Sequence, residues 1–78
     1  MGLDTRSKVE AVFREVFDDD KLQLSDELSA ETFPAWDSLA HIRLVSALED
    51  ELSLTFTLDD IEGMTSAAKV LAVVEAKN

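Results

Sequence analysis

Cysteine is absent from this chain, and proline and glycine are scarce, with one and two residues in 78. Without cysteine the chain can form no disulfide, no thiolate metal site and no cysteine nucleophile. Few positions interrupt a helix, since proline and glycine are its strongest breakers. Hydrophobic residues make up 46% of the sequence, too many for a disordered chain. The composition therefore predicts a small all-α fold, one domain spanning residues 1–78.

Positive charge is also scarce, because seven Lys and Arg face seventeen Asp and Glu, for a net charge of −10. Affinity for nucleic acid comes largely from Lys and Arg that neutralise phosphates. The charge argues against a nucleic-acid partner and favours protein partners with basic surfaces. Because like charges repel in the compact state, we expect salt or divalent cations to raise stability.

Long apolar runs are missing as well. None approaches the roughly 20 residues that span a bilayer, and residues 1–6 form no apolar signal region. The sequence thus predicts a cytoplasmic protein without membrane association. A domain this short has little room for a large enclosed active site, which argues against an enzyme.

Apolar periodicity predicts a first helix from Asp4 to about Phe17. Its stripe falls at helical spacing: Val9, Val12, Phe13, Val16 and Phe17. Asp4 could cap this helix, and Ser7 with Glu10 also fits the spacing of a capping box. The acidic run at 18–20 should end the helix, because acids at a C-terminus oppose the helix dipole.

Residues 21–36 show no sustained period yet remain apolar at Leu22, Leu24, Leu28, Phe33 and Trp36. They predict an ordered loop packed against the helices, a kind of segment that is often functional. A second helix should run from Ser38 to about Leu52. Its expected inward residues are Leu39, Ile42, Val45, Leu48 and Leu52, with Leu44 beside them.

The C-terminal third predicts two more helical elements. Leu54 and Phe56 should be buried, and residues 57–62 read as a capped single turn that stops at Gly63. Thr65 or Ser66 should cap a last helix whose stripe is Ala67, Val70, Leu71 and Val74. The chain is therefore expected to form a small four-helix bundle, three longer helices plus one short turn, with a long ordered loop between helices 1 and 2.

The start of the second helix raises a chemical question. If Asp37 is the N-cap, then Ser38 is the first helical residue, and its hydroxyl points into solvent while Leu39 enters the core. An enzyme could modify such an exposed oxygen, and the positive end of the helix dipole would favour a phosphodiester there. The alternative is that Asp37 and Ser38 form only a capping pair.

Three stretches, DSL (37–39), LVSALEDEL (44–52) and TLDDIEGMTSAAKVLAVVE (57–75), resemble the acyl carrier proteins and the related peptidyl carrier domains. The resemblance covers essentially the whole chain. It implies that Ser38 carries 4'-phosphopantetheine, which a separate phosphopantetheinyl transferase adds from coenzyme A with magnesium. The thiol of that arm would hold an acyl or aminoacyl group as a thioester, and the carrier itself would catalyse nothing.

The resemblance implies several partners: the transferase, an acyl- or aminoacyl-loading enzyme, and synthase enzymes with basic surfaces. A monomer suits visits to all of them. The expected recognition residues are Asp37, Leu39, Ala40, His41, Arg43, Glu49 and Asp50. The residues expected to form an acyl or pantetheine groove are Trp36, Ile42, Ile61 and Met64, for each of which ordinary packing is the competing interpretation.

The pattern departs from carriers of bacterial fatty-acid synthesis, which usually place acids soon after the serine. Ala40, His41 and Arg43 stand there instead. WDSL looks more similar to stand-alone carriers of secondary metabolism or of specialised fatty-acid and polyketide biosynthesis. Trp36 should pack under the loop, and His41 should be an exposed helix residue.

Two other classes of function remain to be weighed. The chain could be an unmodified acidic helical adaptor, which would tolerate Ser38→Ala. A hydrolase triad of Ser38, His41 and Asp37 is disfavoured because adjacent helix residues do not face each other and no oxyanion site is apparent. No metal site is expected, since the acids at 18–20 lack the glycine and glutamate of an EF-hand loop.

Overall fold

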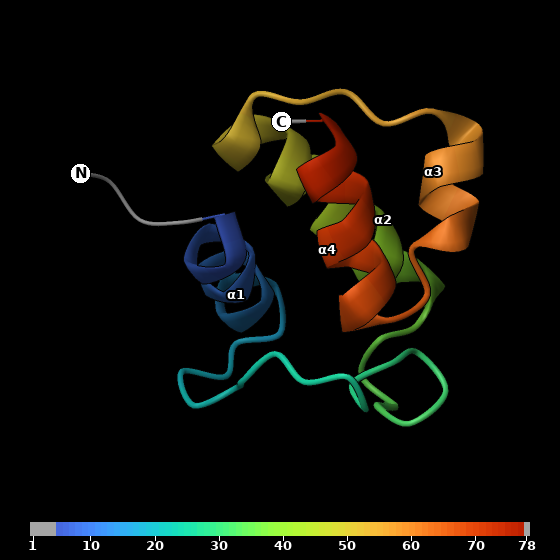
Figure 1. The fold of residues 1–78 in the computed structure, drawn as a ribbon. Coiled ribbons are helices and arrows are strands. Elements are labelled where there is room, and N and C mark those ends of the chain that lie inside the picture. Colours follow the sequence, from blue (N-terminus) through green and yellow to red (C-terminus); the bar gives the residue numbers. More distant parts are fainter. Residues whose placement is uncertain (1–4, 78) are drawn as a thin grey trace.

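The computed structural model describes residues 5–77, and Figure 1 shows their four helices. These are α1 (Thr5–Val16), α2 (Ser38–Leu52), α3 (Leu58–Gly63) and α4 (Ala67–Lys77). The predicted all-α bundle of three longer helices and one short one is therefore confirmed. Among these residues, no helix is both long and apolar enough to cross a membrane.

The two ends of α1 differ from what the sequence suggested. Asp4, one predicted cap, lies outside the described residues, and the alternative capping box is wrong because Ser7 lies inside α1. The helix ends in a Schellman arrangement, in which Asp18 adopts the left-handed conformation (φ 52°). The N–H of Asp19 donates to the carbonyl of Arg14 at 2.9 Å. The helix thus ends at the start of the predicted acidic run, through the backbone conformation of Asp18.

The hydrophobic core lies between α1, α2 and α4, and α3 stands on the side of the bundle away from α1 (Figure 1). Each of the three longer helices buries at least three apolar side chains. The largest fully buried side chains of the core are Val9, Phe13, Leu44, Leu48, Val70 and Val74 from these helices and Met64 from the link between α3 and α4. In contrast, α3 contains no buried residue.

The inward face of α2 is not the one predicted. Leu39 and Ile42 are 58% and 65% exposed, and the buried residues are Leu44, Val45 and Leu48. Three residues turn a helix by about 300°, so each step of three falls about 60° short of a full turn. A stripe traced back from Val45 by threes therefore drifts about 120° by Leu39. The covered face is centred on Leu44 and Leu48 instead.

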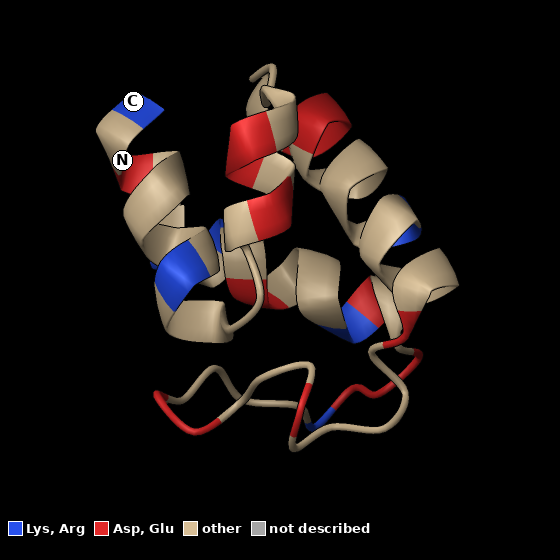
Figure 2. Ribbon diagram, turned by 90° about the vertical axis from the view of Figure 1, so that its right-hand side faces the viewer, with Lys and Arg blue, Asp and Glu red and all other residues tan. Residues whose placement is uncertain are grey.

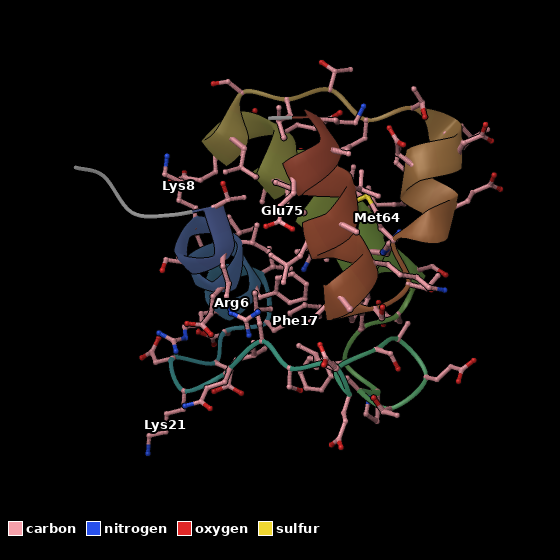
Figure 3. All side chains as sticks on the ribbon, in the orientation of Figure 1. Arg6, Lys8, Phe17, Lys21, Met64 and Glu75 are labelled. Carbon is pink, nitrogen blue, oxygen red and sulfur yellow. The ribbon has the colours of Figure 1, made fainter. Side chains whose placement is uncertain are left out.

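The loop between α1 and α2 is ordered and packed, as predicted, and its first part is held by α1. Arg6 Nη2 donates to the carbonyl of Leu24 at 2.8 Å, and Arg14 Nε donates to that of Leu22 at 2.7 Å. Between them, Glu10 Oε2 accepts the N–H of Leu24 at 3.1 Å. Figure 3 shows Arg6 extending from α1 towards the loop. This row, spaced four residues apart, satisfies loop backbone groups that no helix or strand pairs.

The second part of the loop is held by backbone pairing with the link between α3 and α4. The N–H of Ala30 donates to the carbonyl of Thr65 at 3.0 Å, and that of Ala67 donates to Leu28 at 2.8 Å. Ser29 and Ser66 form an isolated antiparallel bridge there. Residues about 36 positions apart are thus fixed beside each other, which brings the loop next to α3.

The short-range signals around α3 and α4 are mostly confirmed. Thr57 and Asp60 form a capping box at the start of α3, and Ser66 caps α4 by accepting the N–H of Lys69 at 3.2 Å. Gly63 is the last residue of α3 and has no positive φ. The helix therefore ends there without the left-handed glycine that the sequence suggested.

Candidate functional site

Ser38 is the first residue of α2, and Asp37 before it is the N-cap, as predicted. Asp37 Oδ1 accepts the N–H of Ala40 at 2.9 Å, and the carbonyl of Asp37 accepts that of His41 at 2.8 Å. The carboxylate of Asp37 thus satisfies the first turn. Ser38 is exposed, and its hydroxyl is not needed for the cap.

An open groove of about 700 Å³ begins at Asp37 and Ser38. Its walls come from the loop, α2, α3 and the α3–α4 link, through Ala30, Trp36, His41, Ile42, Ile61, Glu62 and Thr65. Three of the four predicted groove residues therefore come together beside Ser38. The fourth, Met64, is completely buried between α3 and α4 (Figure 3), so ordinary core packing is the right interpretation for it.

Trp36 packs under the loop, as predicted, and is only 3% exposed. Its ring meets Phe13 edge to face, with centroids 5.4 Å apart, and Phe17 at 6.1 Å. Phe17 in turn packs edge to face on Phe33 at 5.0 Å. This aromatic cluster fixes the last loop residues before Asp37 and hence the position of the groove wall.

His41 is not the exposed helix residue that the sequence suggested, because it is half-buried and bonded at both ring nitrogens. Trp36 Nε1–H donates to His41 Nδ1 at 3.0 Å, and His41 Nε2 lies 2.8 Å from the carbonyl oxygen of Ile61. An indole nitrogen can only donate and a carbonyl can only accept. The imidazole must therefore be neutral, with its proton on Nε2.

Because both ring nitrogens are bonded elsewhere, His41 cannot act as a base toward Ser38. Nδ1 has its lone pair directed at Trp36, and Nε2 carries a proton directed at Ile61. Neither nitrogen is free to accept a proton from the hydroxyl of Ser38. The geometry thus gives a positive reason against the serine–histidine triad that was weighed from the sequence.

The other predicted recognition residues fall into two groups. Leu39, Ala40 and Arg43 line a smaller hollow of about 250 Å³ next to Asp37, on the opposite side from His41. Neither of the two ion pairs found among residues 5–77 involves Arg43. This first group places two small or apolar side chains and the cation of Arg43 next to the carboxylates of Asp18 and Asp37.

Glu49 and Asp50 lie near the far end of α2, about three helical turns from Ser38. Glu49 Oε2 accepts the N–H of Phe56 at 2.9 Å, so its carboxylate is directed at the link to α3. Asp50 is exposed. Of these two acids, only Asp50 presents a side chain that is not already used inside the fold.

Charge around the site is strongly acidic overall but not at the start of α2. Figure 2 shows acidic residues spread along the loop, with Lys21 as its single base. The first turn of α2 contains no acid. Among the described residues, no cluster of three or more His, Asp or Glu side chains could hold a metal ion.

Asp60 on α3 is the one carboxyl in this region with a shifted pKa. The backbone N–H of Thr57 and then the ammonium of Lys77, 2.9 Å away, hold the pKa of Asp60 below its ordinary value of 3.8. Lys77 also lies over the ring of Phe56 at 5.9 Å. These contacts tie the N-terminal end of α3 to the C-terminal end of α4.

Sequence reasoning missed Ala30, Glu62 and Thr65 as groove residues. Ala30 and Thr65 reach the groove only because the loop pairs with the α3–α4 link. No local sequence pattern predicts that pairing. Glu62 follows Ile61 on α3 and could have been found from its neighbour.

The chain is similar to a protein of known structure. The solution NMR structure of a holo acyl carrier protein from Geobacter metallireducens is 33% identical and matches with a TM-score of 0.85. The match covers 96% of this chain and 86% of that one. No protein-family model matches the sequence, and a comparison with curated proteins gives no match.

Proposed function

The chain belongs to the acyl carrier protein family, and we propose that it holds an acyl or aminoacyl group as a thioester on 4'-phosphopantetheine attached to Ser38. The observation that supports the attachment site is the exposed Ser38 at the start of α2, beside the groove. A tethered group reaches a high effective concentration at each partner enzyme. A domain without an enclosed active site can therefore serve several reactions in turn.

The residues around Ser38 suit a phosphopantetheine group. Asp37 supplies the cap, which leaves the oxygen of Ser38 accessible to a transferase. The first turn of α2 has no acid, and the positive end of the helix dipole favours a phosphodiester. The bound cofactor would supply a flexible arm that ends in a thiol. The groove beside Ser38 offers that arm or its cargo an apolar wall at Ile42 and Ile61.

The chain's own part in the attachment is to present a nucleophile. The Oγ of Ser38 forms the new bond to phosphorus while the nucleotide part of coenzyme A leaves. The base that takes the hydroxyl proton has to come from the transferase, because both nitrogens of His41 are already bonded. Asp37 holds the turn in place during this step.

We place the carrier in specialised biosynthesis, of secondary metabolites, polyketides or unusual fatty acids, rather than in housekeeping fatty-acid synthesis. The first turns of α2 carry Leu39, Ala40 and Arg43, and the first turn has no acid, although Asp18 and Asp37 line the same hollow. Partners that recognise the start of α2 would meet apolar side chains and Arg43 beside these two carboxylates. Basic partner surfaces would meet the acids elsewhere, such as Asp50.

Intact-protein mass spectrometry tests the attachment site. The wild-type chain, Ser38→Ala and the control Ser46→Ala are incubated with a broad-specificity phosphopantetheinyl transferase, coenzyme A and magnesium. Ser46 is a second exposed serine on α2. We expect the mass of one phosphopantetheine group to be added to the wild type and to Ser46→Ala, and no addition to Ser38→Ala.

The competing function is an unmodified acidic adaptor, in which exposed Leu39, Ile42 and Leu58 would contact a protein partner. No mass gain in the folded wild type with several transferases would favour that adaptor. A gain that persists in Ser38→Ala would move the attachment to another residue.

A further inference from the structure

The shortest helix, α3, is held in a different way from the rest of the bundle. It contains no buried residue, and Ile61 is only half-buried. Its N-terminal end is tied to α4 by the Asp60–Lys77 ion pair, and Met64 anchors the chain just after it. On the side that faces the groove, the side chain of Ile61 packs partly against the core and its carbonyl bonds to His41.

His41 joins three segments across that groove. Its backbone belongs to α2, its Nδ1 accepts from the loop residue Trp36, and its Nε2–H donates to Ile61 on α3. The rings of Trp36 and His41 are also stacked, with an interplanar angle of 27° and centroids 6.1 Å apart. Trp36 itself is fixed by the aromatic cluster under the loop. His41 therefore links α3, which is held largely by polar contacts, to Trp36, which is held by aromatic packing.

We propose that His41 is a positioning residue that latches α3 to Trp36 and thereby sets the width of the groove beside Ser38. Because α3 has no fully buried residue and packs only the half-buried Ile61 against the core, it can move away from α2 with little loss of apolar burial once the His41–Ile61 hydrogen bond is lost. The inference rests on the proposed function in one respect: a cargo too large for the present groove has to displace α3. His41 then determines how readily larger cargo is accommodated.

Two amide variants separate the two hydrogen bonds of the latch, that with Trp36 and that with Ile61. In His41→Asn the side-chain oxygen can take the place of Nδ1 and accept from Trp36, but the side chain is too short to reach Ile61. In His41→Gln the amide nitrogen can take the place of Nε2 and donate to Ile61, while the acceptor for Trp36 is lost. His41→Phe keeps an aromatic ring and loses both bonds. Ser46→Asn, at an exposed position of α2, is the control for helix propensity.

Hydrogen exchange of the unmodified protein, followed by NMR, is the first measurement. The amide of Ile61 reports on α3, and Trp36 is the only tryptophan, so its indole N–H gives a single resonance. We expect His41→Asn and His41→Phe to speed exchange in α3 roughly fivefold or more, the loss of one hydrogen bond. His41→Gln should restore α3 but speed exchange of the indole. Ser46→Asn should change neither.

A purely structural role of His41 would not make His41→Asn act on Ile61 and His41→Gln act on the indole of Trp36. If His41 only fills space, then Asn and Gln will speed exchange alike at Ile61, at the indole and at core amides such as that of Val70. That outcome overturns the latch. It does so without any loaded group, so it leaves the attachment at Ser38 untouched.

The consequence for cargo is tested on loaded protein. Acetyl and octanoyl groups are installed on wild type, His41→Asn and His41→Gln from the matching acyl coenzyme A, and thioester hydrolysis is measured. We expect the octanoyl-to-acetyl ratio of hydrolysis rates to fall at least twofold in His41→Asn, because the longer chain enters the widened groove, and to stay near wild type in His41→Gln. Equal ratios in all three proteins would overturn the role of His41 in cargo size. Failure to load any of them would contradict the proposed function instead.

Discussion

Two neighbouring helices, α3 and α4, are stabilised by different kinds of contact. Helix α4 buries Ala67, Val70 and Val74, whereas α3 has no fully buried residue. Besides the partly packed Ile61, α3 is held by the Lys77 ion pair and the bond from His41, and a capping box closes its first turn. Apolar burial is the sum of many small, non-directional contacts. Polar links are few, and each can be lost separately. Movement in this fold should therefore concentrate in α3, next to the groove.

The largest effect should come from removing Met64, the fully buried residue that follows α3. Met64→Ala deletes a fully buried side chain at the α3–α4 link and should lower the free energy of unfolding by about 2–5 kcal/mol. Leu58→Ala on α3 is the matched control, since Leu58 is 71% exposed and should cost less than about 0.5 kcal/mol. Urea unfolding followed by circular dichroism measures both. A similar decrease in the free energy of unfolding for the two variants would mean that exposed Leu58 anchors α3 as strongly as buried Met64 does.

A smaller and more local effect is expected from the two caps. Thr57 caps α3 and Ser66 caps α4, and replacing either with alanine should cost about 1 kcal/mol. Because α3 lacks burial, Thr57→Ala should speed hydrogen exchange at Ile61 without changing that at Val70. Ser66→Ala should instead lower global stability and therefore speed hydrogen exchange at core amides such as that of Val70. Equal, global effects from both caps would show that α3 unfolds only together with α4.

The local signals were the predictable part of this fold. The start of α2 at Ser38, its cap by Asp37 and the cap of α4 by Ser66 all depend on residues within three positions of one another. Such hydrogen bonds form in any helix with that sequence, so a pattern of residue types is enough to find them. The resemblance to carrier proteins placed the site at the same serine.

The long-range contacts were not predictable. Which face of α2 is covered depends on how α1 and α4 lie against it, and therefore Leu39 and Ile42 were wrongly placed in the core. His41 was missed for the same reason, because Ile61 lies twenty residues further along the chain. The groove depends on that contact and on the pairing of Ala30 with Thr65. No periodicity within one helix contains this information.

The carboxylate of Asp60 makes the polar attachment of α3 to α4 dependent on pH. Its pKa is lowered in the folded chain, so its stabilising contribution is fully present above its ordinary value of 3.8 and is lost as the pH falls through the folded value. Asp60→Asn should therefore lower the melting temperature at pH 7, and the difference from wild type should shrink below about pH 4. Asp59→Asn, an adjacent exposed acid of α3, is the control. A constant difference at all pH values would rule out the charge of Asp60 as the source.

Salt should affect α3 and α4 to different extents, with the smallest changes of the series. The chain has a net charge of −10, so raising NaCl from 0.01 to 1 M should reduce its self-repulsion and raise the melting temperature, as the Debye length falls from about 30 to about 3 Å. The same screening weakens the ion pair between Lys77 and Asp60, which is partly exposed. Exchange at Val70 should then become slower with salt while exchange at Ile61 becomes slower by less, or faster. Lys77→Met removes the pair and should abolish that difference. If Ile61 and Val70 respond equally in the wild type, the ion pair does not hold α3, and His41 and the capping box must do so alone.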